Sequence, residues 1–239
     1  MRSEQRNSVI NHPTDDNIVV VSTQINVLFV DATTLITVKI MGSGREIRDV
    51  AISGDGTKCV VSYNVKARCV VYDITDINNI TPIRVCQMYY CLRSADIHND
   101  GRKLVCAGIL GVMLFDATTS LPTKKLSEKE TYFVRFIYEP EGVLHLNAYG
   151  VHLLDMSGLI LRSFSGIHYG PFITVINNNR WLVTANVDNS LHIHDFATGE
   201  TINRFYHHSS MGFDGRVVYQ PYQKKLIGVS GGNLFVLSH

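Results

Sequence analysis

The stretch "VLFVDATT" (residues 27–34) decides the fold, because similar phrases return at a near-constant interval. The copies read "CVVYDITD" (69–76), "VMLFDATT" (112–119), "VHLLDMSG" (151–158) and "LHIHDFATG" (191–199). Their acidic residues are separated by 42, 43, 39 and 40 positions and are Asp31, Asp73, Asp116, Asp155 and Asp195. A phrase repeated at such a period marks a structural unit that recurs along the chain.

Each copy has the pattern of a β-strand with one face in a core. Apolar residues or cysteine lie two and four positions before each acidic residue, as Val27 and Phe29 lie before Asp31. Side chains two apart share one face of a strand. Between copies, Asp55-Gly56 and Asp100-Gly101 separate further apolar runs, and Asp-Gly supplies the left-handed backbone that a hairpin turn needs. One more short run follows each copy, so the unit has four short antiparallel strands in about 40 residues.

Four-stranded units repeated at this interval predict a β-propeller. No stretch has a sustained 3.6-residue apolar period, which excludes helical repeats. We expect one all-β domain over residues 1–239, a propeller of about six four-stranded antiparallel blades. In this interpretation each phrase is the outer strand of its blade and the turn that leaves it.

The repeats resemble those of the WD40 family over nearly the whole chain. The acidic residue that ends each phrase carries the resemblance, and it follows a residue at the position where the family usually has Trp: Val30, Tyr72, Phe115, Leu154 or His194. The chain departs from the family pattern in two ways. Its single Trp181 lies elsewhere, and the family's Gly-His dipeptide is missing, with Gly44-Arg45 in one such place.

The first blade is expected to be incomplete. Counted in this way, it begins at its second strand, "SVINHP" (8–13), with no residues left for the innermost one. The ring would then be open, and a partner or a second copy would supply the missing strand. Two alternatives stay open: the leading polar residues or a small distortion suffice, or the chain is an abbreviated form of a longer protein.

Composition narrows the class of protein. With 22 Lys and Arg against 21 Asp and Glu, the net charge of +1 provides no broad field for nucleic acid or anionic lipid, so we expect neither as a main partner. The first 17 residues have no signal-peptide core, and no window approaches the roughly 18 apolar residues of a membrane span. We therefore expect a cytoplasmic or nuclear protein without direct membrane insertion.

The five cysteines are expected to be free thiols, with Cys59, Cys69 and Cys106 in the core.

The recurring aspartates and the histidines suggest structural roles more than catalytic ones. The recurring Asp residues are about 40 positions apart, so they lie around the rim and do not converge as a paired acid and base must. We expect each to accept hydrogen bonds from backbone N–H groups two residues on.

His192 and His194 share a strand face, yet a zinc site needs two further ligands. The alternative has His194 packed between blades and His192 partly solvated. No nucleophile or phosphate-binding motif occurs, so we expect no catalytic residue, metal or cofactor.

The loops that join first to second strands contain a candidate partner-binding surface. Large semi-rigid side chains dominate the energetics of protein interfaces. Such side chains, with histidines, occur in three of these loops: Tyr89, Tyr90, His168, Tyr169, Phe172, His207, His208, Met211 and Phe213. The alternative is that these rings fill the channel or pack under their own loops.

The expected function is that of a non-catalytic scaffold, a subunit of an intracellular assembly that binds other proteins. It rests on the resemblance to WD40 repeats and on the lack of a chemical constellation. One alternative is an enzyme or a cofactor-binding propeller that gathers ligands at the channel mouth. Another is a protein-bound subunit of an RNA-containing assembly.

Overall fold

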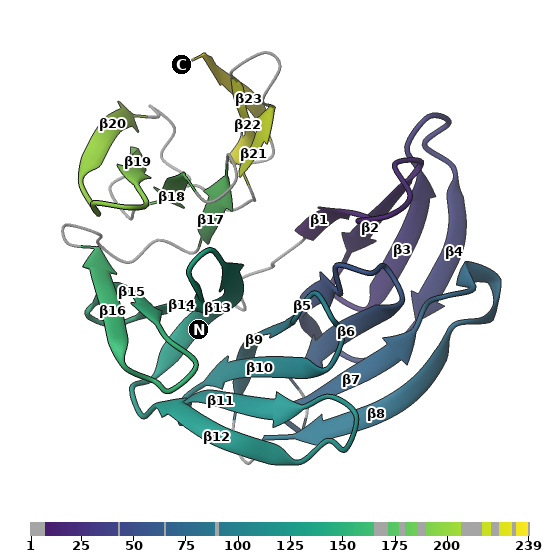
Figure 1. Ribbon diagram of the computed structural model, residues 1–239. Coiled ribbons are helices and arrows are strands. Elements are labelled where there is room, and N and C mark those ends of the chain that lie inside the picture. Colours follow the sequence, from purple (N-terminus) through teal and green to yellow (C-terminus); the bar gives the residue numbers. More distant parts are fainter. Residues whose placement is uncertain are drawn as a thin grey trace.

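The computed structural model describes residues 8–42, 44–64, 66–88, 91–164, 172–176, 180–185, 190–206, 217–220, 225–230 and 233–238. Within these ranges the chain forms short antiparallel strands and one 3₁₀ turn, η1 (Ile77–Asn79). The described strands form five four-stranded sheets and one three-stranded sheet, arranged around a ring (Figure 1). The expected fold class, an all-β propeller, is confirmed.

Each four-stranded sheet is a blade of consecutive strands. Blade 1 contains β1 (Ser8–Asn11), β2 (Ile18–Ser22), β3 (Asn26–Asp31) and β4 (Thr37–Gly42). Blade 2 contains β5 (Ile47–Ile52), β6 (Lys58–Tyr63), β7 (Arg68–Asp73) and β8 (Thr81–Gln87). Blade 3 contains β9 (Leu92–Ile97), β10 (Lys103–Gly108), β11 (Gly111–Asp116) and β12 (Pro122–Ser127).

Blade 4 contains β13 (Thr131–Tyr138), β14 (Glu141–Asn147), β15 (Gly150–Leu154) and β16 (Ile160–Phe164). Blade 5 contains β17 (Phe172–Ile176), β18 (Trp181–Ala185), β19 (Ser190–Asp195) and β20 (Thr201–Tyr206). The three-stranded sheet contains β21 (Val217–Gln220), β22 (Lys225–Ser230) and β23 (Asn233–Ser238). The first strand of one blade contacts the first strand of the next in blades 1 to 4, where β1 contacts β5 and β9 contacts both β5 and β13, so the first strand of each blade is the inner one.

The strand order corrects the position assigned to the recurring phrase. In blade 1 the order is β1-β2-β3-β4, so the phrase forms the third strand and the run after it is the outermost strand of the same blade. The turn after Asp31 is short, and Val30 pairs with Thr37, so the chain folds straight back onto the phrase. Antiparallel neighbours need only such a short connection.

The expectation of an incomplete first blade is therefore wrong. Blade 1 has four strands, and β1 occupies its inner position, where Val9 pairs with Val21. Among the described residues there are five four-stranded blades and not six, and the sheet with three strands is the last one, β21–β23. No innermost position is vacant in blade 1, so a partner strand at that position is not required.

Four apolar clusters, each shared by two consecutive blades, form the described core. Successive side chains of a strand point to opposite faces, so one strand contributes to two clusters. In β6, Val60 belongs to the cluster shared with blade 3 and Val61 to the cluster shared with blade 1. In β14, Val143 and Leu144 divide between blades 3 and 5 in the same way. Blades 2, 3 and 4 are thus buried on both faces.

The hairpins between first and second strands use the expected glycines. Gly56 and Gly101 have φ values of 70° and 66°, in the left-handed region that favours glycine. Beside them, the Asp55 and Asp100 carboxylates accept hydrogen bonds from the backbone N–H groups of Thr57 and Arg102, at 3.0 and 2.8 Å. These turns set the register in which blades 2 and 3 begin.

Shortening a core side chain at a blade interface should destabilise the whole ring. Leu144 is fully buried between blades 4 and 5, and we expect Leu144→Ala to lower the free energy of unfolding by about 2–5 kcal/mol. Urea denaturation measures this loss. Leu121→Ala is the control, because Leu121 is exposed and its loss should cost less than about 0.5 kcal/mol. Equal effects of the two substitutions would contradict this core.

Candidate functional site

The loop residues predicted to bind a partner lie outside the described part of the chain, in the connections from β8 to β9, β16 to β17 and β20 to β21. These connections join one blade to the next, which corrects the expectation that they join first to second strands. The residues are Tyr89, Tyr90, His168, Tyr169, His207, His208, Met211 and Phe213. Phe172 begins β17, and its side chain is also outside the description. The loop surface therefore stays a prediction, and the site is built below from residues that the structure describes.

The five recurring Asp residues make hydrogen bonds at the turns between third and fourth strands. The Asp31 carboxylate accepts from the N–H groups of Thr33 and Thr34, at 2.9 and 2.7 Å. Asp73, Asp116, Asp155 and Asp195 each accept from the N–H group two residues on, at 2.7 to 2.9 Å. In Asp31 the bonds from Thr34 contribute most to a pKa below the usual range. These carboxylates hold turns and lie on separate blades.

The two histidines of β19 are both buried. The rings of His192 and His194 are 5.9 Å apart, and His194 lies 6.4 Å from the ring of Phe164 in blade 4. His192 forms a hydrogen bond with the Ser190 hydroxyl at 3.0 Å, and it is only 7% exposed, which corrects the expectation of partial solvation. Burial lowers the pKa of His194 to about 4, so it is neutral at physiological pH. Among the described residues no three His, Cys, Asp or Glu side chains form a metal-binding group.

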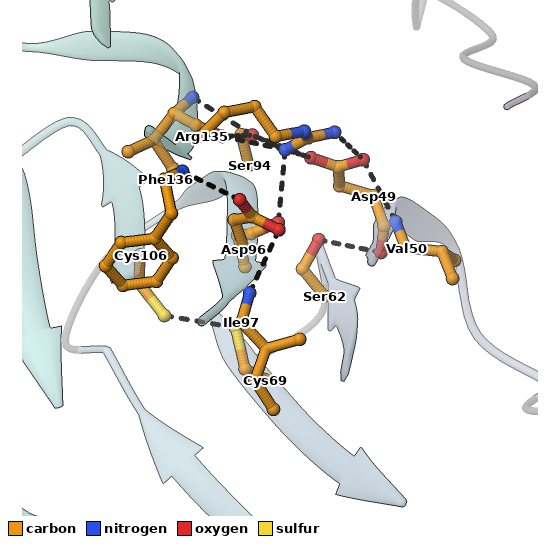
Figure 2. Close-up of polar contacts among 12 residues, drawn as sticks. Asp49, Val50, Ser62, Cys69, Ser94, Asp96, Ile97, Cys106, Arg135 and Phe136 are labelled. Carbon is orange, nitrogen blue, oxygen red and sulfur yellow. Dashed lines mark hydrogen bonds and ion pairs between the residues drawn. The ribbon is translucent and has the colours of Figure 1, made fainter. Parts of the chain in front are cut away.

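A group of polar and charged side chains on the inner strands was missed by sequence reasoning. Asp49 of β5, Ser94 and Asp96 of β9 and Arg135 of β13 meet where the inner strands of blades 2, 3 and 4 lie side by side (Figure 2). We call these four residues the inner-strand network. The sequence does contain a sign of this network, because charged side chains interrupt the apolar pattern of all three inner strands: two in β5, two in β9 and one in β13. Sequence alone did not show that the interruptions face one another.

An ion pair with two hydrogen bonds is the centre of the inner-strand network. Arg135 donates from Nη1 to Asp49 Oδ2 at 2.9 Å and from Nη2 to Asp49 Oδ1 at 3.0 Å. Ser94 donates its hydroxyl to Asp49 Oδ2 at 2.6 Å and accepts from the backbone N–H group of Val134 at 3.2 Å. The pair therefore joins blade 2 to blade 4 across blade 3. Bidentate pairing of this kind is the strongest ion-pair geometry that Arg offers.

Asp96 is the second carboxylate of the inner-strand network. Its two oxygens accept from the backbone N–H groups of Ile97 at 3.0 Å and Phe136 at 2.8 Å. Burial raises its pKa to about 6, and the nearby Arg135 charge only partly offsets that effect. Burial opposes the charge of Arg135 as well, but Asp49 and Asp96 outweigh it and raise the pKa of the guanidinium. Because protein groups already occupy these polar atoms, the network suits a structural role better than substrate binding.

A second feature is the face of blade 1 that points away from blade 2. Ile18, Val20, Val27 and Phe29 are buried against blade 2. The opposite face is also apolar, because Val21 pairs with Leu28, Leu28 with Ile40, and Val19 with Val30. We call this the first-blade face, and none of its residues is buried: Val19, Val21, Leu28, Val30, Val38 and Ile40. Blade 1 thus differs from blades 2 to 4, in which both faces are buried.

The edge of blade 1 continues the first-blade face. β4 is the terminal strand of its sheet (Figure 1). Four apolar side chains on and just before it are largely exposed: Leu35 (77%), Ile36 (64%), Val38 (47%) and Ile40 (58%). Isolated exposed apolar residues are ordinary on protein surfaces, but a contiguous group at a sheet edge marks an interaction site or an aggregation hazard.

No family model matches the chain, and a search of curated proteins finds no similar one. In the described residues no helix is long and apolar enough to cross a membrane.

Removing Arg135 should leave a buried carboxylate without its counter-charge. We expect Arg135→Met to lower the free energy of unfolding by about 3–5 kcal/mol, because breaking a buried pair on one side costs more than removing both partners. The double variant Asp49→Asn, Arg135→Met should recover part of that loss in urea denaturation. The control is Lys125→Met, which breaks an exposed pair with Glu128 and should cost less than about 1 kcal/mol. Additive single effects of Asp49→Asn and Arg135→Met would contradict a coupled pair.

Asp96 should make stability depend on pH in a defined window. Its pKa is about 6 in the folded protein and 3.8 in the unfolded chain, so the folded state binds the proton more tightly. Its contribution to stability is therefore complete below pH 4 and is lost as pH rises through 6, by about 3 kcal/mol. The turn aspartates act in the opposite sense below pH 4, because their folded pKa values are lowered.

The measurement compares the wild type with Asp96→Asn, which cannot titrate. The difference in unfolding free energy, wild type minus variant, should be about 2–3 kcal/mol more favourable to the wild type at pH 4 than at pH 7. A difference that does not change with pH would show that Asp96 titrates normally.

Proposed function

We propose that this protein is a non-catalytic scaffold that binds other proteins, and that blade 1 contains a partner site. The observation that carries the proposal is the apolar first-blade face, together with the exposed edge strand β4. A face of this kind is usually covered, because burying apolar surface is the main favourable term in protein association.

Strand addition is the mode of binding that this edge favours. An extended segment of another protein can pair its backbone with the free edge of a sheet, and its alternate side chains then contact the sheet face. At β4 those side chains would meet Ile40, which pairs with Leu28 of the first-blade face, and the exposed Val38 at the register shift beside it. The expected partner segment is therefore extended, with apolar residues at every second position.

Two of the other outer strands, β8 and β12, are protected against edge pairing in a way that β4 is not, whereas β16 resembles β4 in having exposed apolar residues on or just before it, Leu159, Ile160 and Leu161. β12 exposes Lys124 and Lys125 and begins with Pro122, and such residues discourage edge pairing. β8 also contains a proline, Pro82, and exposes Arg84. In β4 the one charged side chain, Lys39, is only half exposed and donates to the backbone carbonyl of Asn78 at 2.7 Å. Because β4 has no proline and no fully exposed charged side chain, we infer that its edge binds a strand of a partner.

The proposal is tested by placing charge on the edge. The tagged full chain is recovered from the cells that produce it naturally, and proteins present in equal molar amount are quantified by mass spectrometry. We expect the double variant Val38→Lys, Ile40→Lys to reduce recovery of such a companion at least tenfold, because each lysine would have to be desolvated in the interface. Circular dichroism and the melting temperature should match the wild type, since both positions are exposed.

The matched control is Ile202→Lys. Ile202 is the second residue of outer strand β20, as Val38 is of β4, and it is 47% exposed. It should leave the companion bound. Recovery of the wild-type chain alone as a stable monomer would overturn the scaffold proposal. A companion that survives the β4 charges would overturn only the placement of the site on blade 1.

A further inference from the structure

Three buried cysteines lie together between blades 2 and 3. Cys69 on β7 and Cys86 on β8 are directly paired across blade 2, and Cys106 on β10 belongs to blade 3. All three are fully buried in the apolar cluster that these blades share. The Sγ atoms of Cys69 and Cys106 are 3.3 Å apart, and Figure 2 shows the two thiols pointing toward each other. Both residues are free thiols in the structure.

This contact is specific to one pair. Cys59 lies in a different cluster, between blades 1 and 2. Cys91 is half exposed, and its Sγ lies 3.7 Å from Asn64 Oδ1, so its neighbour is an amide and not a thiol. A metal does not account for the pair, because no metal-binding group of three suitable side chains exists in the described residues.

We propose that Cys69 and Cys106 are a modification site, at which a hydroperoxide converts the two thiols into a reversible disulfide between blades 2 and 3. The geometry requires little movement. A disulfide has an S–S distance of about 2.05 Å, so the sulfur atoms must approach by about 1.3 Å. The two sulfur atoms already point toward each other, so the approach is along the line that joins them.

The reaction balances with hydrogen peroxide as the oxidant. One thiol, as its thiolate, attacks a peroxide oxygen, the O–O bond breaks, and a sulfenic acid and one water are formed. The second thiolate then attacks the sulfenic sulfur, the S–O bond breaks, and the S–S bond and a second water are formed. Two thiols lose two protons and two electrons in total, and one peroxide is reduced to two waters. A dithiol reductant reverses the modification.

Burial determines when the modification occurs. Burial raises the pKa of the Cys69 thiol well above its usual range, so the closed interface holds an unreactive thiol. Reaction therefore requires the interface between blades 2 and 3 to open locally. When the interface closes again, it returns the second thiol to within 3.3 Å of the first sulfur, so the sulfenic acid is captured as a disulfide. The disulfide would therefore accumulate in those molecules whose interface between blades 2 and 3 has opened under oxidising conditions.

The test uses the full-length reduced protein and hydrogen peroxide. After oxidation and quenching, the protein is denatured without reductant, alkylated with iodoacetamide and weighed intact. We expect a species with three alkylated cysteines in place of the five of the reduced chain, and peptide mapping should identify the Cys69–Cys106 link. The link closes a loop of about 37 residues, so the melting temperature should rise by about 10 °C and return after dithiothreitol.

Variants separate this pair from its neighbours. Cys86→Ala should retain the cross-link, and Cys69→Ala or Cys106→Ala should abolish it. Peptide mapping of the oxidised wild type shows whether the Cys69–Cys106 disulfide forms, even if a variant folds poorly. Five alkylated cysteines after treatment, irreversible oxidation without a cross-link, or links made only through Cys91 would each overturn the proposal. The outcome does not depend on whether blade 1 binds a partner.

Discussion

The packing of one β-sheet against the next is the constraint on which this structure depends. A four-stranded sheet has two faces, and an interior blade must bury both, which is why adjacent residues such as Val60 and Val61 serve different neighbours. The burial of apolar area at each interface, at about 25 cal/mol per Å², stabilises a sheet that would be marginal alone. Stability is therefore a property of neighbouring pairs of blades. The free energy of unfolding therefore falls when the packing of any single interface is weakened.

Much of this architecture was predictable from local pattern. The period of the phrase, the strand alternation before Asp31 and the Asp-Gly turns report on contacts close in sequence, so they indicated the propeller correctly. The assignment of strands to blades failed because the pattern does not say whether the run after Asp31 pairs backward or moves on to the next sheet. The inner-strand network was missed for a related reason. Asp49 and Arg135 are 86 residues apart, and only the packing of the inner strands of three successive blades brings them together.

The candidate site on blade 1 illustrates the same division between local and distant information. Its apolar edge is visible in the sequence as "LITVKI" (35–40), but the sequence also contains "VVVS" (19–22) and "VLFV" (27–30), which are equally apolar. Only the sheet order shows that Val38 and Ile40 lie on an outermost strand with exposed side chains, whereas Val27 and Phe29 are buried. An apolar run identifies a strand, and its place in the sheet decides whether that strand supports the fold or is free for a partner.

The ion pair between Asp49 and Arg135 also limits how this ring can evolve. Repeat proteins usually gain or lose units by duplicating or deleting one copy, because each unit contacts only its neighbours. Here the guanidinium of blade 4 neutralises the carboxylate of blade 2, with Ser94 of blade 3 between them. Deleting any one of these three blades would leave an unmatched buried charge or a misplaced partner. Blades 2 to 4 are therefore expected to be inherited as one block, and changes in repeat number should be confined to the ends of the chain.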